Sequence, residues 1–384
     1  MSGIMVEPDL NFIKGLTASG AETLKKCYQC ATCSVVCNIA PEGSPFPRKE
    51  MLWAQWGLKD KIAADPDVWL CHNCGDCTKH CPRGAKPAEV LGALRKASIE
   101  KYAMIKPLAG IGGNFMASFI VGAIVVAALL AFTGHLNIFA NYHQVDENGK
   151  VNIIFNNFIP THNVDFLFMP LFFLALLTAG YGLMKFWNDI CDQAGLGKLT
   201  GRNALPSILP TLVQIVKHDV FSNCGLNKDR KIPHLLALFS FIALFVTTNW
   251  AVFYLYVLGW APGSYSSLGN PLKWLGNLGA VMLLVGAFWL IKNRKAKPAK
   301  DGSTGSAFDW NLLYLILLIG ITGIVAEVLR IAGAVVPAQV TYVLHLIFIA
   351  QLFIFTPYSK LAHLVYRTTA MVFAKHTGRE LKTT

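Results

Sequence analysis

The sequence predicts a mostly α-helical protein in two parts, a polar cysteine-rich domain and a bundle of six membrane-spanning helices. Three observations support this class. Hydrophobic residues make up 54% of the 384 residues and charged residues only 15%, whereas about 25% of a typical soluble chain is charged. Eight of the ten cysteines lie in two short motifs between residues 27 and 81. Six long apolar stretches follow these motifs.

Residues 1–105 form the predicted polar domain. They contain no apolar run long enough to span a bilayer, and the first twenty lack the basic start and apolar core of a secretory signal. We therefore expect this domain in the cytoplasm, where clustered cysteines bind metal more often than they form disulfides. Residues 87–103 ("PAEVLGALRKASIEKYA") have helical spacing with proline at the start, which predicts a helix.

The two cysteine motifs share the spacing Cys-x2-Cys-x2-Cys-x3-Cys. Motif 1 ("CYQCATCSVVC") runs from Cys27 to Cys37, and motif 2 ("CHNCGDCTKHC") runs from Cys71 to Cys81. Each motif can reach three irons of a [4Fe–4S] cube, and in the bacterial ferredoxin arrangement the fourth ligand is the last cysteine of the other motif. The predicted ligands are Cys27, Cys30, Cys33 and Cys81 for cluster 1, and Cys71, Cys74, Cys77 and Cys37 for cluster 2.

Zinc and disulfides explain this pattern less well. Zinc sites are usually completed by pairs of ligands, without a third cysteine between them, and disulfides are disfavoured in the cytoplasm. The proline that usually follows such a motif is present as Pro82 after motif 2, but Asn38 replaces it after motif 1. Cys191 and Cys224 stand alone, and we expect them to be packing residues.

The second predicted part, residues 106–384, contains the membrane spans. The apolar stretches lie near 108–133, 163–187, 233–258, 274–291, 310–330 and 338–358. Most approach or exceed the roughly 20 residues that a helix needs to cross the bilayer, and the fourth is the shortest. Between the spans, 207–221 reads as an amphipathic helix on the inner surface, and 292–306 ("KNRKAKPAKDGSTGS") as a polar linker. Asn148-Gly149 predicts a small hairpin.

The distribution of charge predicts the orientation of the bundle. Seven, five and five Lys or Arg residues lie in 185–231, 292–309 and 358–384. The opposite loops hold only Lys150, Lys273 and Arg330. By the positive-inside rule both termini are expected in the cytoplasm, with the bundle in the inner membrane. Topology thus explains most of the net charge of +12, and nucleic-acid binding is not expected.

Two histidines near the last span predict haem ligands. Ionisable residues at membrane depth are costly and are functional candidates by default. His345 and His363 stand 18 residues apart, which in a continuous helix makes five whole turns and about 27 Å. Because imidazole is a common haem ligand, this spacing predicts axial ligands for an outer and an inner b-type haem.

The second ligand of each haem must come from another helix. His234, after a basic cluster and a helix-starting proline, is the candidate for the inner haem, and His218 is the alternative. For the outer haem the candidate is His162, with His135 and His143 as alternatives. The two histidines between cysteines are expected to be solvated or to lie behind the ligands; these are His72 and His80.

Residues 20–100 resemble the small iron–sulfur subunit of heterodisulfide reductases, as the cysteine motifs show. Residues 108–375 resemble the gamma-type cytochrome b of nitrate reductase, through "HDVFSNC…KDRKIPHLLALFSFIALFVTT" and the histidine pair. Their fusion in this order is similar to the C subunits of quinone-modifying oxidoreductase (Qmo) complexes of sulfate reducers. The resemblance implies a cytoplasmic helical ferredoxin-like domain with two [4Fe–4S] clusters, followed by a six-helix transmembrane dihaem cytochrome b bundle.

The resemblance also implies partners and a reaction. Two flavin-containing iron–sulfur subunits would link menaquinone to adenylylsulfate (APS) reductase in sulfate respiration. The alternatives are a subunit that serves a thiol–disulfide substrate and a haem-free membrane anchor. One departure concerns the outer haem: the nitrate-reductase cytochrome has two histidines ten residues apart on one helix, but here Leu244 follows His234 at that distance.

A quinone site is predicted at the outer end of the fifth span. Glu327 and Arg330 stand three residues apart there, at the depth of His345. Glu327 would accept a proton as quinol is oxidised, and the alternative is a structural Glu–Arg pair. Electrons would pass between quinone, outer haem, inner haem, the two clusters and a cytoplasmic partner. The direction depends on potentials that the sequence does not predict.

Overall fold

The computed structural model describes residues 7–140, 143–145, 151–197, 201–226, 228–261 and 269–379. Within these ranges the chain is mostly helical with very little strand, which confirms the predicted class. The two short strands β1 (Gln144–Val145) and β2 (Val151–Asn152) pair antiparallel. The turn predicted at Asn148-Gly149 lies outside the described residues.

Short helices build the cysteine-rich region. They are α1 (Leu10–Ala18), α2 (Thr32–Val35), α3 (Arg48–Gln55), α4 (Lys59–Ala63), α5 (Asp67–Leu70), α6 (Asp76–Lys79), α7 (Pro87–Tyr102) and α8 (Lys106–Ile111), with a 3-10 turn η1 (Leu24–Lys26). The helix predicted over 87–103 is thus confirmed as α7. Its buried side chains, Leu91 and Leu94 among them, pack with Leu16 and Met51 in one core. The cysteine loops pack against this core.

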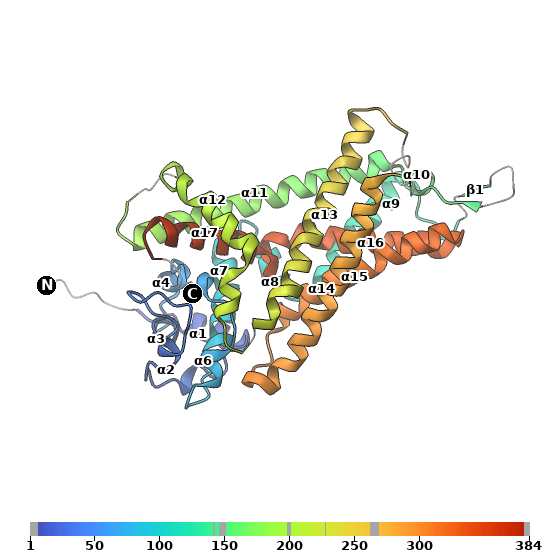
Figure 1. The fold of residues 1–384 in the computed structure, drawn as a ribbon. Coiled ribbons are helices and arrows are strands. Elements are labelled where there is room, and N and C mark those ends of the chain that lie inside the picture. The colour runs from blue at the N-terminus through green and yellow to red at the C-terminus, as the bar shows by residue number, and fades with distance from the viewer. Residues whose placement is uncertain are drawn as a thin grey trace.

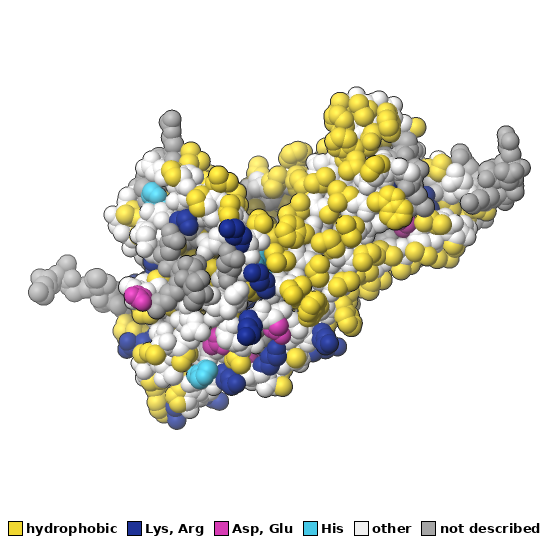
Figure 2. All heavy atoms as spheres, viewed as in Figure 1, with side chains coloured by type: hydrophobic (Ala, Val, Ile, Leu, Met, Phe, Trp, Pro, Cys, Tyr) yellow, Lys and Arg dark blue, Asp and Glu magenta, His cyan; other side chains and the backbone are white. Residues whose placement is uncertain are grey.

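Among the described residues, six helices are long and apolar enough to cross a membrane. They are α9 (Phe115–Thr133), α11 (Thr161–Gln193), α13 (Lys231–Tyr256), α14 (Pro271–Asp301), α15 (Ala307–Ile331) and α16 (Val335–Phe355), and a short α10 (Phe155–Phe158) precedes α11. Each predicted stretch, including the short fourth, corresponds to one of them. They lie side by side in Figure 1, and apolar side chains cover much of their visible surface in Figure 2. Lipid can face such a surface because helices satisfy their backbone hydrogen bonds internally.

The segment 292–306 is not the predicted polar linker. Helix α14 continues to Asp301 and ends at Gly302, whose φ of 74° makes a left-handed cap. Arg294, Lys297 and Asp301 are buried in this extension of α14, which packs against α6 of the cysteine-rich region (Figure 1), and Arg294 also pairs with Asp309 of α15. Lysine and alanine are good helix formers, so the composition was compatible with helix as well as linker.

The last span is also broken where the spacing argument assumed a continuous helix. α16 ends at Phe355, two 3-10 turns follow as η5 (Thr356–Tyr358) and η6 (Lys360–Ala362), and α17 (His363–His376) begins at His363. Pro357 has no N–H to donate to the preceding turn. The five-turn relationship between His345 and His363 is therefore wrong.

The cysteine-rich region packs on one end of the bundle. Trp69 stacks on Tyr366 of α17 with ring centroids 4.9 Å apart, and both rings contact Phe186 of α11. The Tyr102 hydroxyl donates to Asp189 Oδ2 at 2.9 Å. The predicted amphipathic helix is present as α12 (Gly201–Lys217) beside α17, and η2 (Asp219–Asn223) and η3 (Lys228–Arg230) lead from it to α13. These contacts bring motif 2 against the bundle.

Candidate functional site

The two cysteine motifs fold as copies of one loop. Gln29 and Asn73, each two residues after the first cysteine, have φ of 61° and 53°. Ala31 and Gly75, two residues further on, have φ of 70° and 96°, and a four-residue helix follows each. Left-handed backbone is costly for residues other than glycine and is concentrated at functional sites. Such turns point successive N–H groups into one concavity that suits an anion.

Four thiols line one small cavity at motif 2. They belong to Cys71, Cys74 and Cys77 of this motif and to Cys37, the last cysteine of motif 1. The Asn73 N–H donates to Cys71 Sγ at 3.2 Å. Burial raises the pKa of Cys37 to about 12, and the charges of Cys71 and Cys74 add to this effect. The structure thus brings together the four cysteines predicted for cluster 2.

The four cysteines predicted for cluster 1 also lie together. Burial raises the pKa of Cys33 to about 11, and the neighbouring charges of Cys27, Cys30 and Cys81 raise it further. The Ala85 N–H donates to Cys81 Sγ at 3.3 Å. Cys30 is exposed, whereas Cys71 and Cys77 are buried. The first set therefore opens to the surface and the second lies inside the molecule.

One cysteine expected to serve packing alone lies beside the second set. Cys191 is buried in the core as predicted. Cys224 is also buried, but it hydrogen-bonds to Cys74, and this contact and burial both raise the pKa of Cys74. The next two N–H groups, of Gly225 and Leu226, each donate to the Asp76 carboxylate at 2.9 Å. Segment 224–226 thus packs directly against motif 2.

Three arginines hold the backbone of motif 2. Arg367 of α17 donates to the Cys71 carbonyl at 3.0 Å, and Arg95 of α7 donates to the same oxygen. Arg230 of η3 donates to the Asn73 carbonyl at 3.1 Å. Sequence reasoning missed all three arginines. A signal was available for two of them, because Arg230 and Arg367 stand one helical turn from the candidate haem ligands His234 and His363.

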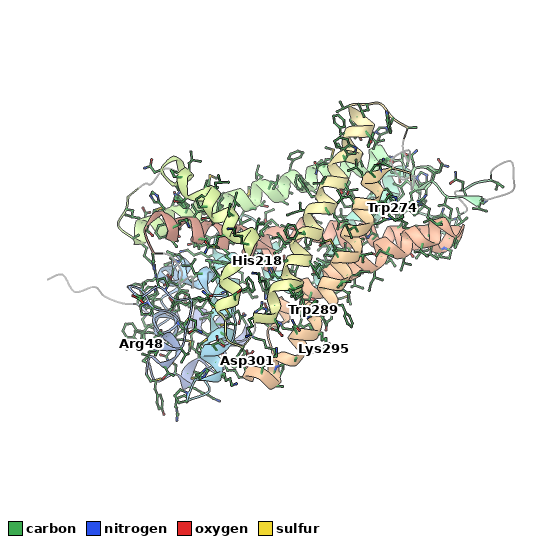
Figure 3. All side chains as sticks on the ribbon, in the orientation of Figure 1. Arg48, His218, Trp274, Trp289, Lys295 and Asp301 are labelled. Atoms are coloured by element: carbon green, nitrogen blue, oxygen red, sulfur yellow. The ribbon has the colours of Figure 1, made fainter. Side chains whose placement is uncertain are left out.

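Three histidines meet between α12, α13 and α17. The rings of His234 and His363 have centroids 6.3 Å apart at an interplanar angle of 76°. His218 Nε2 lies 2.9 Å from His234 Nδ1, and His363 Nδ1 lies 2.6 Å from the Lys360 carbonyl oxygen. Figure 3 shows His218 near the middle of the molecule, where α12 approaches α13. The predicted pair is brought together, and its rival His218 is a neighbour of His234.

This arrangement leaves the Nε2 atoms of His234 and His363 for a metal. Metal-binding histidines usually engage their other ring nitrogen in a hydrogen bond of this kind. The ring centroids of His234 and His363 lie 6.3 Å apart, so both imidazoles are within reach of one iron, which they would hold between them.

Aromatic contacts connect the histidines with motif 2. Phe221 lies 5.4 Å from the ring of His234 and 4.6 Å from that of His72, measured between centroids. His72 is buried, and its Nε2 contacts Arg367. It therefore lies behind the cysteines rather than in solvent. His80 is exposed, and its Nδ1 lies 2.9 Å from the Asp76 carbonyl oxygen.

The predicted outer haem pair is not brought together. His345 Nδ1 lies 3.0 Å from the Thr322 hydroxyl. His162 instead has its Nδ1 3.1 Å from the hydroxyl of Tyr256, which donates to Asp165. Of the alternatives, His135 packs its ring against Phe158. His345 on α16 and His162 on α11 are thus held by different partners among the described residues.

Glu327 has a different partner from the one the sequence suggested. Lys273 Nζ of α14 lies 2.6 Å from Glu327 Oε2, and the Asn277 amide donates to Oε1 at 3.2 Å. The alternative of a Glu327–Arg330 pair within α15 is therefore wrong. The carboxylate sits between two helices at the predicted quinone site.

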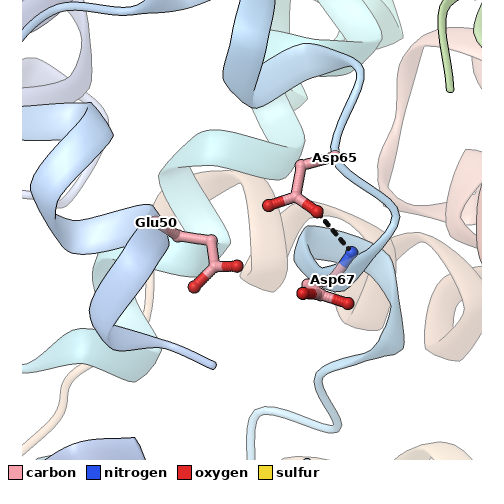
Figure 4. Close-up of side chains that lie close together, drawn as sticks. All are labelled: Glu50, Asp65 and Asp67. Atoms are coloured by element: carbon pink, nitrogen blue, oxygen red, sulfur yellow. Dashed lines mark hydrogen bonds between the residues drawn. The ribbon is translucent and has the colours of Figure 1, made fainter. Parts of the chain in front are cut away.

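A buried ion cluster, which was not predicted, lies between α3 and the start of α5. The carboxylates of Glu50, Asp65 and Asp67 face one another in Figure 4. Lys49 Nζ lies 3.4, 3.0 and 2.9 Å from them, and Arg379 also contacts Asp67. An ammonium group already lies among the three carboxylates. The cluster is therefore an ion network that connects α3 with Asp65, Asp67 and Arg379.

Comparisons with known proteins match both parts of the chain. Residues 152–383 match the family described as Citrate utilization protein B, and residues 23–85 match the 4Fe-4S dicluster domain. Citrate utilization protein B of Escherichia coli is 25% identical over 79% of this chain and 80% of its own length. No solved structure matches.

Other relatives match only the cysteine-rich region. A protein of Archaeoglobus profundus described as similar to the C subunit of heterodisulfide reductase is 40% identical over 22% of this chain and 46% of the relative. The C subunit of the H(2):CoB-CoM heterodisulfide,ferredoxin reductase of Methanothermobacter marburgensis is 33% identical over 28% of this chain and 58% of the relative. The chain thus spans about half the length of these two relatives. They confirm the resemblance to the small iron–sulfur subunit, while the bundle matches a family other than the one its histidines suggested.

Proposed function

The chain belongs to the citrate utilization protein B family, and from that premise we propose that it links a membrane quinone pool to cytoplasmic redox partners. Its iron–sulfur domain places it among electron-transfer subunits related to the C subunit of heterodisulfide reductase. The proposal adds two [4Fe–4S] clusters, b-type haem, menaquinone as substrate, and an inner-membrane location with both termini in the cytoplasm. The names of the relatives do not supply these additions.

The thiol sets fit two [4Fe–4S] clusters. Each set offers four sulfur donors, and each loop directs backbone N–H groups inward, as an anionic cluster requires. We assign Cys27, Cys30, Cys33 and Cys81 to cluster 1 and Cys71, Cys74, Cys77 and Cys37 to cluster 2. The raised pKa values of Cys33 and Cys37 mean that iron must displace protons from thiols when it binds.

One contact chain carries the proposal. His363 begins α17, and Arg367, one turn later, donates to the carbonyl of Cys71. Phe221 bridges His234 and His72 beside the same loop. A haem held by these two histidines would thus be separated from cluster 2 by a single layer of side chains, which favours electron transfer between them.

The exposure of the two thiol sets supports an order for the proposed centres. Cluster 2 faces the bundle, whereas cluster 1 opens to the surface at Cys30. The neighbouring Tyr28 and Val35 are 67% and 82% exposed. Electrons would therefore pass between the inner haem, cluster 2, cluster 1 and a partner that covers this face. Two flavin and iron–sulfur subunits of the Qmo type, which serve APS reductase, are the partners that the domain order favours.

The outer half of the bundle would receive electrons from quinol. His345 is the proposed ligand of the outer haem, since its Nδ1 is held by Thr322 and Nε2 is left for iron. His162, the predicted second ligand, contacts Tyr256, so His345 is the one ligand that we propose for this haem. Glu327, which pairs with Lys273, would accept a proton from quinol, and Arg330, three residues later on α15, would help to form the site.

A thiol–disulfide substrate is the second candidate. The heterodisulfide reductase names of the relatives favour it, and both functions use the same iron–sulfur domain. They differ in the partner that receives electrons at cluster 1. A haem-free anchor would need neither His234 nor His363 in their present arrangement.

Spectroscopy of the purified full chain tests the proposal. We expect b-type bands in a reduced-minus-oxidised visible spectrum and two [4Fe–4S] signals in electron paramagnetic resonance (EPR). A short-chain menaquinol should reduce the haem, and His363→Ala should remove the band of the inner one. A spectrum without b-type bands would establish the anchor instead. Reduction by a dithiol but not by menaquinol would favour the second candidate.

A further inference from the structure

We propose that Arg95, Arg230 and Arg367 form a cationic collar that raises the reduction potential of cluster 2. The inference rests on the proposed function, because it needs a [4Fe–4S] cluster on the cysteines that line the motif 2 cavity. The three guanidinium groups come from three separate parts of the fold and converge on one loop. That convergence is the observation to be explained.

The collar residues contact the loop through its carbonyl oxygens. Arg367 donates to Trp69 and Cys71 at 2.9 and 3.0 Å, and Arg230 donates to His72 and Asn73 at 3.4 and 3.1 Å. Arg95 adds a bond to Val68 at 2.8 Å and another to Cys71. These carbonyls thus point outward to the arginines, while the thiols point inward to the cavity.

The collar lacks a carboxylate counter-ion. In the described part of the chain none of the three arginines forms an ion pair with Asp or Glu; their hydrogen bonds go to backbone oxygens and, for Arg367, to His72. Arginine side chains are not deprotonated in proteins, so Arg367 is a cation at neutral pH. Partly buried cations that lack a counter-ion are costly. An anionic cube held by four thiolates supplies the missing charge.

Other charged groups near the loop do not cancel the collar. Asp301 pairs with Lys297 at 3.5 Å, and Lys297 also donates to the Asn73 side chain. Asp76 accepts the N–H groups of Gly225 and Leu226. Among these groups Lys297 offsets Asp301, and Asp76, whose Oδ2 also lies 3.4 Å from Cys74 Sγ, offsets one of the three arginines, which leaves an excess of positive charge beside the cavity.

Motif 1 has the same backbone but a different electrostatic setting. Arg48 donates to the Gln29 carbonyl at 3.1 Å, the position equivalent to Asn73, but its side chain is exposed. Figure 3 shows Arg48 on the far side of the cysteine-rich region from α14. Water and salt screen such an exposed charge. The two motifs thus form an internal comparison in which only motif 2 has a collar.

The collar acts on electron transfer through charge alone. Reduction of the cube adds one electron to an already anionic centre, and no bond or proton changes place. Burial opposes this step because it penalises the added charge, whereas fixed cations nearby favour it. The collar would offset the penalty of burial and keep cluster 2 reducible by a donor on the membrane side.

A redox titration with EPR detection tests the collar. The full chain in detergent would be titrated with dithionite and redox mediators, and the two [4Fe–4S] signals followed separately. We expect Arg367→Gln to lower the midpoint potential of cluster 2 and to leave that of cluster 1 unchanged. Arg367→Lys keeps the charge and should keep most of the potential. Arg48→Gln removes a guanidinium from motif 1 and should leave cluster 2 unchanged. Cys30→Ser identifies the cluster 1 signal.

Unchanged potentials in Arg367→Gln, with full iron content, would overturn the collar. If this variant loses iron, Arg230→Gln removes a collar charge from another part of the fold. Iron loss in both variants without a shift of the residual signal would also overturn it, because the arginines would then only hold the loop. Absence of both signals from the unmodified protein refutes the proposed function and the collar together. Two titrating clusters without haem bands refute only the haem.

Discussion

Gly75 of motif 2 lies against Asp301 at the end of α14, so closely that a Cβ added to Gly75 would overlap the carboxylate. Gly75 also has a φ of 96°, a backbone conformation that residues other than glycine rarely adopt. Figure 3 shows Asp301 at the end of α14 nearest the cysteine-rich region. One glycine thus combines the turn of a cysteine loop with the docking of a membrane helix.

Substitution of Gly75 should therefore damage cluster 2. Gly75→Ala is expected to cost about 1–2 kcal/mol for the left-handed backbone and about 1–3 kcal/mol more for the overlap with Asp301. Gly84→Ala is the matched control, because Gly84 has a φ of 64° but no atom within 4 Å of an added Cβ. Thermal unfolding and iron content would be measured for both. Equal losses would show that the contact with Asp301 contributes nothing.

The three histidines should differ in their effect on haem. His234→Ala and His363→Ala should each abolish the inner haem, because each removes an axial ligand. His218→Ala should keep it with roughly 10–100-fold weaker binding, the usual effect of losing a hydrogen bond behind a ligand. Haem content per protein chain would be measured by visible absorption. Loss of haem in His218→Ala but not in His234→Ala would make His218 the ligand.

Glu50 should make stability fall as pH rises. Its pKa is raised well above the usual value, first by burial and then by the charge of Asp65. The unfolded chain loses this proton near pH 4.3 and the folded chain only at higher pH. Stability is therefore full below that pH and declines, by up to about 1.4 kcal/mol per pH unit, until the folded pKa is passed.

Glu50→Gln tests this pH dependence. The variant cannot lose a proton, so its melting temperature should exceed that of the unmodified protein by a margin that grows as the pH rises above about 4.3. Glu22→Gln, at an exposed position, is the control and should track the unmodified protein. A variant whose melting curve falls in parallel with the unmodified protein would assign the pH dependence to another group.

Substitutions of Glu327 and Lys273 should distinguish a role in proton transfer from a role in the ion pair. Glu327→Gln removes the proposed proton acceptor and should slow haem reduction by menaquinol about 100-fold or more. Lys273→Gln breaks the same 2.6 Å pair but keeps the carboxylate, so its effect on this rate should be small. Reduction by dithionite should be unchanged in both variants. Normal menaquinol rates in Glu327→Gln would place the quinone elsewhere.

The thiol sets could be anticipated from spacing, but their surroundings could not. The interlocked arrangement needs only the positions of eight cysteines, and the fold brings Cys37 to motif 2 and Cys81 to motif 1 as that spacing implies. The collar unites Arg95, Arg230 and Arg367 from distant parts of the chain. No periodicity relates such residues, because their contacts depend on how the helices pack.

The helical class, the six spans and the two groups of cysteines follow from the order of the amino acids. These features depend on local quantities: the length of an apolar run, which must match the bilayer, and the spacing of ligands along one loop. Packing between distant segments sets the continuation of α14 to Asp301 and the support of His234 by His218. The reason is that each of these outcomes balances a local preference against contacts with residues far away in the chain.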